Sequence, residues 1–174
     1  MAFLFISAKA QLDTIPKIDG QYQYVGVVSV DSSFKKEDLY NKSKLYFVDV
    51  YNSAKDVIQY DDKDAGRIVG KGFLELNDMQ WVAPWIWDVY YTTEIMVKNG
   101  KYKYRFYDIH IKQYVGTSKI ETDLTIDDAM NQLHKMGYKK MTAKLLENTA
   151  KKFQNSIDVL KSYMANKENT KNDF

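Results

Sequence analysis

Only two histidines occur in the chain, and one of them follows a carboxylate closely in the sequence. His110 comes two residues after Asp108, so the two side chains share a face if the segment is a β-strand. A carboxylate that orients an imidazole can serve as a general base in hydrolysis. That chemistry also needs a nucleophile or a metal ion, and no motif beside the pair marks either. We therefore interpret the pair as a polar surface contact, with a hydrolase-type enzyme using Asp108 and His110 as the alternative.

The acidic run 61–64 (DDKD) offers carboxylate oxygens, which calcium prefers as ligands. A calcium loop of the EF-hand type ends on a glutamate at its twelfth position, but counting from Asp61 or Asp62 reaches Gly72 or Phe73. A solvated turn explains the run without a metal. With no cysteine and two histidines, few donors remain for a catalytic zinc. The sequence predicts no metal site, no cofactor and no catalytic residue.

Three tryptophans fall within seven positions, mostly in a segment that we expect to connect two strands. These residues, Trp81, Trp85 and Trp87, lie around Pro84. Indole rings at the rim of a groove bind apolar, aromatic or sugar-like ligands, or side chains of a partner protein. The same rings can instead close the open end of a hydrophobic core. A second candidate surface is the strand face with Tyr102, Tyr104 and Phe106, which aromatic pairing across strands also explains.

The composition limits which partners such surfaces can bind. The 174 residues include 25 Lys and Arg against 23 Asp and Glu, a net charge of +2 that is spread along the chain. This balance provides no basic footprint for nucleic acid. The absence of cysteine excludes disulfides, thiol catalysis and a lipid-anchored N-terminal cysteine. No segment approaches the roughly 18 apolar residues of a membrane-spanning helix, so we expect no transmembrane segment.

The N-terminus indicates export. An apolar stretch over 2–7 precedes Ala8-Lys9-Ala10, a small-x-small pattern typical of a signal-peptidase site. We interpret residues 1–10 as a truncated signal peptide, 11–20 as a linker, 21–165 as a single domain and 166–174 as a polar tail. A short buried N-terminal strand is the alternative. Export predicts a periplasmic or secreted protein.

Hydrophobic periodicity and turn residues divide the chain into elements. We expect strands over 21–30, 56–60, 67–76, 87–98 and 101–115, and helices over 35–51, 126–136 and 139–165. Asn99-Gly100 is a strong hairpin signal. The main elements predict an α+β fold of order β-α-β-β-β-β-α. In this fold, a curved five-stranded antiparallel sheet carries the long C-terminal helix on one face.

Alternation within the strands predicts which side chains face the core. On 67–76 the core-facing side carries Gly70 and Gly72, which indicate a bend or the close approach of a helix. On 101–115 alternation puts two apolar sets on opposite faces, namely Tyr102, Tyr104 and Phe106 against Tyr107, Ile109 and Ile111. The apolar stripe of the last helix comprises Leu145, Thr149, Phe153, Ile157, Leu160 and Met164.

This order of elements is that of a single TATA-binding-protein-like (TBP-like) repeat. Three segments carry the resemblance further, namely 36–40 (KEDLY), 59–72 (QYDDKDAGRIVGKG) and 97–104 (VKNGKYKY). Over roughly 21–115 the chain resembles an uncharacterised family of exported Bacteroidetes proteins, a domain of unknown function with a TBP-like fold. Lys101 departs from the arginine more often expected there. The resemblance implies the fold and an envelope or secreted location, and it implies no activity.

We conclude from the sequence that the chain is an exported, non-catalytic protein that binds a partner protein or a small apolar or aromatic ligand. The candidate contacts are Trp81, Trp85, Trp87, Tyr102, Tyr104 and Phe106. The alternatives are the hydrolase described above and nucleic-acid binding on the sheet. TATA-binding proteins place their concave sheet face on DNA, but export and a near-neutral charge argue against that use here.

Overall fold

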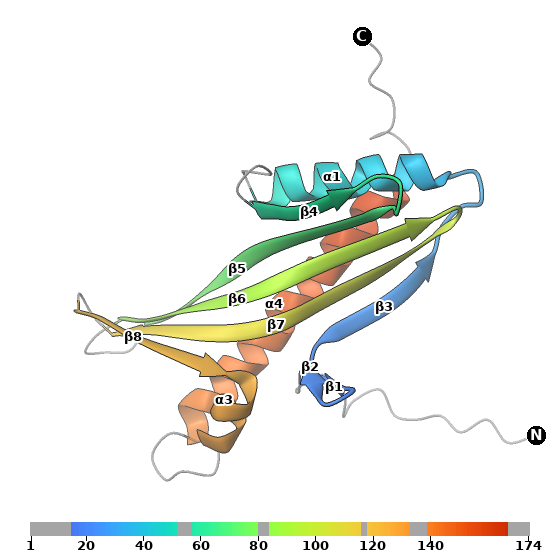
Figure 1. Cartoon of the computed structure of the whole chain (residues 1–174). Helices are drawn as coiled ribbons and strands as arrows, with labels where there is room; N and C mark the ends of the chain where they lie inside the picture. Colours follow the sequence, from blue (N-terminus) through green and yellow to red (C-terminus); the bar gives the residue numbers. More distant parts are fainter. Residues whose placement is uncertain (1–14, 52–56, 80–83, 116–117, 133–138, 167–174) are drawn as a thin grey trace, which may run out of the picture.

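The computed structural model describes residues 15–51, 57–79, 84–115, 118–132 and 139–166. Its strands are β1 (Lys17–Ile18), β2 (Gln21–Tyr22), β3 (Tyr24–Ser29), β4 (Ile58–Asp62), β5 (Arg67–Met79), β6 (Pro84–Lys98), β7 (Lys101–Val115) and β8 (Ser118–Thr125). Its helices are α1 (Lys36–Tyr51), α3 (Ile126–Gln132) and α4 (Lys139–Ala165). The main sheet is antiparallel in the order β3-β7-β6-β5-β4, and β8 also pairs with β7 (Figure 1). The predicted α+β class is confirmed.

The sheet extends further than the sequence predicted. β5 and β6 run on into the expected connection 77–86, and β8 adds a sixth strand. The sequence of β8 is mostly polar because it lies at the margin of the sheet, so alternation does not reveal it. Residues 17–20, expected as linker, belong to the small β1–β2 hairpin. These additions surround the middle of β7, where the candidate site lies.

Both long helices pack on one face of the sheet and bury an aromatic core there. The predicted stripe of α4 is buried along its whole length. At its centre, the Phe153 ring lies 5.0 Å from the rings of Tyr24 and Tyr91. Burial raises the pKa of four tyrosine hydroxyls of this core, those of the buried Tyr46, Tyr91 and Tyr102 and of the half-buried Tyr24. In the described part of the chain, the opposite face of the sheet is left uncovered (Figure 1).

The glycines of β5 lie where α1 crosses the sheet. A Cβ atom on Gly70 would meet the Phe47 ring, and one on Gly72 would meet the Tyr51 ring. Both rings project from α1, so the predicted close approach of a helix is confirmed. The glycines let the helix settle against the strand without an intervening side chain.

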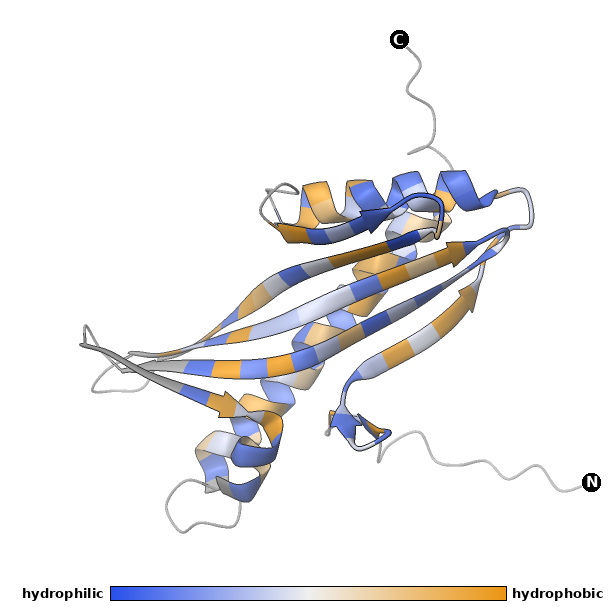
Figure 2. Ribbon diagram, in the orientation of Figure 1, coloured by the Kyte–Doolittle hydropathy of each residue, from blue (hydrophilic) through white to orange (hydrophobic). Residues whose placement is uncertain are grey.

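A β-bulge at Asp108 changes which face of the sheet the later side chains of β7 occupy. Asp108 has a positive φ of 55°, and the β6–β7 register shifts between Tyr90 and Thr92. The extra residue keeps two apolar sets on the core side, Tyr102, Tyr104 and Phe106 before the bulge and Ile109 and Ile111 after it. The prediction that these sets occupy opposite faces is therefore wrong. Polar and apolar segments alternate along β7 in Figure 2.

Candidate functional site

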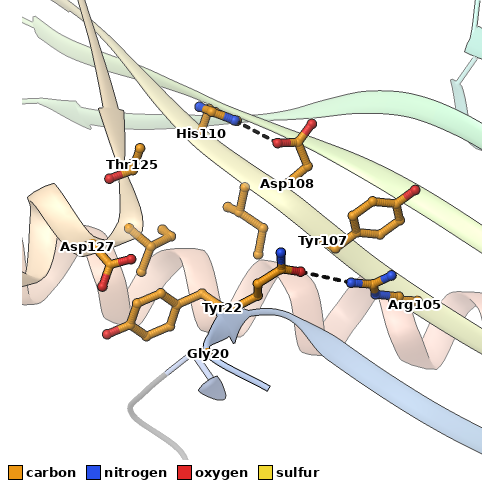
Figure 3. Close-up of a pocket in the computed structure, with 11 residues that line it drawn as sticks. Gly20, Tyr22, Arg105, Tyr107, Asp108, His110, Thr125 and Asp127 are labelled. Atoms are coloured by element: carbon orange, nitrogen blue, oxygen red, sulfur yellow. Dashed lines mark hydrogen bonds and ion pairs between the residues drawn. The ribbon is translucent and has the colours of Figure 1, made fainter. Parts of the chain in front are cut away.

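A surface hollow lies where β7 changes neighbours along one edge. β3 pairs with β7 as far as Phe106, and β8 pairs with β7 from His110 onward. Between these stretches the β1–β2 hairpin and the β8–α3 junction face the bulge across an open groove of about 560 Å³ (Figure 3). This volume lies within the range of small-molecule sites. The groove is lined by Gly20, Gln21, Tyr22, Arg105, Tyr107, Asp108, Ile109, His110, Thr125, Ile126 and Asp127.

The predicted pair of Asp108 and His110 is present in this groove. His110 Nε2 lies 2.9 Å from Asp108 Oδ1, and His110 Nδ1 lies 3.6 Å from Asp123 Oδ1. All three side chains are largely solvent-exposed. Asp108 holds its position at the cost of a left-handed backbone, which non-glycine residues rarely adopt. Strain of this kind marks the bulge as a candidate site.

The hydroxyl of Thr125, across the sheet from His110, is already held by other groups. Thr125 lies opposite His110 in the sheet register. Its hydroxyl donates to Asp128 Oδ2 at 2.7 Å and accepts the Asp128 N–H at 3.1 Å. Thr125 therefore caps α3. Hydrolysis at this pair would then use water rather than this hydroxyl as the nucleophile.

The opposite wall of the groove is held by polar contacts between distant segments. Arg105 Nη2 donates to Gln21 Oε1 at 3.0 Å, and the Arg105 guanidinium lies 4.2 Å from the centre of the Tyr107 ring. Lys17 Nζ donates to Asp127 Oδ1 at 2.8 Å, which ties the hairpin to the start of α3. These contacts order the rim, and they leave a mixed surface of rings, carboxylates and a guanidinium.

The uncovered sheet face carries a second candidate surface. Val27, Lys103, Met96 and Arg67 lie in one row across four strands. Val27 is 67% exposed and Met96 37% exposed. A shallow hollow of about 210 Å³ lies beside them. We call the exposed residues here the Met96 patch; they are Val27, Met96, Lys98, Lys101 and Lys103.

The structure does not bring the predicted contacts together on one surface. Trp87 is buried in the core from β6, Trp85 lies near the start of β6 with a side chain outside the described part, and Trp81 lies outside the described residues. Tyr102, Tyr104 and Phe106 are all buried on the helix side. Their position fits the alternative interpretation of aromatic core packing. The exposed face could have been found from the positions between these rings. Lys101, Lys103 and Arg105 alternate with them in the sequence, as expected of a strand face in contact with solvent.

Within the residues that the structure describes, no group of His, Cys, Asp and Glu side chains is arranged to hold a metal ion. None of the described helices combines the length and the apolar character needed to span a membrane.

Comparison with known proteins identifies the family. Residues 24–112, just over half of the chain, match the domain of unknown function (DUF4468) with TBP-like fold. The chain belongs to this family. The resemblance inferred from the sequence is thereby confirmed. The match contains Asp108, His110 and the whole Met96 patch, and it ends before β8 and α3, which form the far wall of the groove.

Two solved structures share the fold of this DUF4468 protein. A TBP-like protein from Parabacteroides distasonis has a TM-score of 0.70 and 17% identity, covering 86% of this chain and 96% of that one. A DUF4468 family protein from Bacteroides ovatus has a TM-score of 0.57 and 12% identity, covering 84% of this chain and 89% of that one. At these identities the likeness shows the fold alone. No curated protein matches the chain.

Proposed function

We propose that this DUF4468 protein is an exported, non-catalytic binding protein that holds a partner protein on its uncovered sheet face. One observation carries the proposal. Large apolar side chains stand exposed on the sheet face that no described element covers, namely Val27, Tyr60, Phe73 and Met96. Exposed apolar side chains gathered beside cations are typical of protein interaction sites.

The charges of the Met96 patch indicate what kind of partner fits. Three lysines surround its apolar floor. The nearest carboxylate in the register, Glu94, is only 9% exposed and accepts a 2.6 Å hydrogen bond from Arg67 Nε. The patch therefore presents positive charge around Met96 and Val27. A partner with apolar anchors flanked by Asp or Glu would complement it, and this charge match would speed association at low salt.

Site-specific crosslinking tests this assignment. A photo-crosslinking residue at position 96 should capture a partner in cells, whereas the same residue at position 48 on α1 should not. Val48 is a matched control because it is 44% exposed against 37% for Met96. The captured partner should bind the purified protein with a Kd that rises at least tenfold in Met96→Glu and stays unchanged in Val48→Glu. Equal capture at both positions, or none at either, would refute the binding face.

The predicted tryptophan contacts stay part of the proposal. Trp85 is the second residue of β6, and Trp81 precedes that strand in the sequence, so their involvement would extend the contact beyond the Met96 patch. A Trp85→Ala variant should weaken binding of the same partner while folding normally. An unchanged Kd would remove this segment from the site and leave the patch proposal standing.

Export is tested separately. We expect the protein in a periplasmic or culture fraction, with a mature N-terminus near Gln11 because Ala8-Lys9-Ala10 precedes it. N-terminal sequencing of the protein from its own cells measures this directly. A cytoplasmic protein that keeps residues 1–10 would contradict export.

The groove supports an enzyme as a second candidate. The specific observation is the 2.9 Å contact between His110 Nε2 and Asp108 Oδ1 beside a 560 Å³ hollow. Such a pair could deprotonate a water molecule. Turnover in a hydrolase screen that disappears in His110→Ala would favour the enzyme. Turnover that persists in that variant, or no turnover with any substrate class, would count against it.

A further inference from the structure

One edge of the main sheet is open in the described part of the chain. β3 forms this edge and, among the described residues, pairs with β7 alone. Two hydrogen bonds fix the direction of its backbone groups. The Val30 N–H donates toward β7 to the Gly100 carbonyl at 2.9 Å, and the Gln23 N–H donates the other way to the Pro16 carbonyl at 2.9 Å. Because these directions alternate along a strand, the backbone groups of Val25, Val27 and Ser29 point outward.

This edge lacks the usual protection against strand pairing. Natural edge strands carry lysine, proline or bulges, or a helix covers them. β3 reads Tyr-Val-Gly-Val-Val-Ser, without a charge or a proline, and its register with β7 is regular. The most exposed large apolar side chain of the described residues, Val27, lies near its centre.

We propose that β3 pairs with β3 of a second copy of this chain, antiparallel about a two-fold axis at Val27. Val27 then faces Val27 of the other copy, and Val25 faces Ser29. The outward N–H and C=O groups of Val25, Val27 and Ser29 then pair with those of the other copy. Three facing pairs with two hydrogen bonds each give about six backbone hydrogen bonds. The Gln23–Pro16 bond limits the paired segment at one end, and the turn after Val30 limits it at the other. Two sheets become one, with both Met96 patches on the same face.

Charge does not prevent this pairing. Lys103 lies next to Val27 in the register, so the two copies of Lys103 stand three strand spacings apart, about 14 Å. That distance exceeds the Debye length of about 8 Å at physiological ionic strength. Because the contact is short, we expect a weak dimer with a Kd on the order of micromolar or above.

Cysteine scanning tests the register, because the chain has no cysteine of its own. In Val27→Cys the two Cα atoms would lie about 5.5 Å apart, within the span of a disulfide. Mild oxidation should therefore give a covalent dimer. Ser29→Cys is the matched control, since its two copies would lie about 14 Å apart and should stay monomeric. Mixing Val25→Cys with Ser29→Cys should give the mixed dimer. Equal crosslinking of Val27→Cys and Ser29→Cys would overturn the register.

Sedimentation of the full chain tests the pairing itself. Val27→Pro removes an N–H that points away from β7, so the fold tolerates it while the dimer loses hydrogen bonds. We expect its dimer Kd to rise at least tenfold, with an unchanged Kd in Val27→Thr. Wild type that stays monomeric at every concentration overturns the proposal. So does a lower Tm of Val27→Pro at a protein concentration where the wild type is monomeric, because it would show that the chain's own segments already occupy this edge.

The proposed dimer and the proposed partner site can be refuted independently of each other. Met96 lies two strands away from β3 and takes no part in the pairing. Met96→Glu should leave the dimer unchanged. Val25→Pro removes another outward N–H of β3 at a residue outside the Met96 patch, so it should weaken the dimer and leave crosslinking from position 96 in place. Loss of partner capture in Val25→Pro with a monomeric wild type would show that the partner itself supplies the added strand, and would overturn self-pairing.

Discussion

A single methyl group at position 70 should destabilise the protein through α1. In Gly70→Ala the new Cβ would lie 2.5 Å from Phe47 Cε1, 3.0 Å from Phe47 Cδ1 and 3.2 Å from Val57 Cγ1. Optimal carbon contacts are about 3.5–4.0 Å. Phe47 is fully buried, and its ring packs 5.7 Å from the Tyr46 ring and 5.6 Å from the Tyr51 ring. The ring therefore has no open space to enter, and α1 must shift.

The expected loss of folding free energy in Gly70→Ala follows from two opposing effects. Overpacking a buried site costs about 1–3 kcal/mol of folding free energy. Replacing glycine by alanine recovers about 0.4–1 kcal/mol by restricting the unfolded chain. The balance is a loss of about 1–2 kcal/mol. At about 2–4 °C for each kcal/mol in a domain of this size, Tm should fall by about 2–8 °C.

Urea denaturation followed by circular dichroism measures this loss. Lys71→Ala, an exposed neighbour on the opposite face, is the control and should change stability by less than about 0.5 kcal/mol. In a Phe47→Leu background the smaller side chain leaves room, so the cost of Gly70→Ala should shrink by at least about 0.5 kcal/mol. A Gly70→Ala protein as stable as wild type, or a cost unaffected by Phe47→Leu, would refute the proposed packing of α1 on β5.

Three further predictions concern strain and titration. Asp108→Val should lose about 1–2 kcal/mol of unfolding free energy because a β-branched residue fits the left-handed backbone poorly, while Asp108→Gly should match wild type in the same urea titration. The pKa of Asp62 is lowered by hydrogen bonds from the Ala65 N–H and the Tyr60 hydroxyl, so the stability it contributes is present above about pH 4 and lost below it. Asp62→Asn should flatten acid unfolding curves in that range. Burial raises the pKa of the buried tyrosines, so stability should fall as pH rises above about 10. Their phenolate absorbance should then appear only with the loss of circular dichroism.

The sheet and its long helix could be predicted because their buried faces leave a period in the sequence. Ile95 and Val97 alternate with exposed residues on β6, and Phe153 and Leu160 follow the helical repeat on α4. β8 leaves no such period. It lies along the margin of β7, and among its described side chains Leu124 packs against the core.

The candidate site was only partly predictable for a related reason. Spacing alone placed Asp108 and His110 on one face, because the two residues follow each other within one strand. The bulge at Asp108 depends on the partner strand, since an extra residue is visible only when β7 is counted against β6. The groove also needs the β1–β2 hairpin and the start of α3, which meet β7 only after folding. Trp87 was expected at the start of a strand and as a candidate contact, but β6 begins earlier, at Pro84, and Trp87 faces the core.

The distribution of charge on the uncovered face argues for a protein partner over a nucleic acid. The charged side chains of the Met96 patch itself are lysines. Beyond the bulge, the same face turns to carboxylates, with Glu75, Asp88, Asp108 and Asp123 around His110 and Lys112. A nucleic acid backbone needs positive charge along its whole path, and these carboxylates would repel phosphates over half of the sheet. A folded protein has its own pattern of charge, so it can match a basic region beside an acidic one.

Pairing through β3 would set the two basic patches next to each other at the centre of one longer sheet, and the acidic ends would lie outermost. A partner with a single acidic, apolar segment would then find its strongest attraction at the two-fold axis.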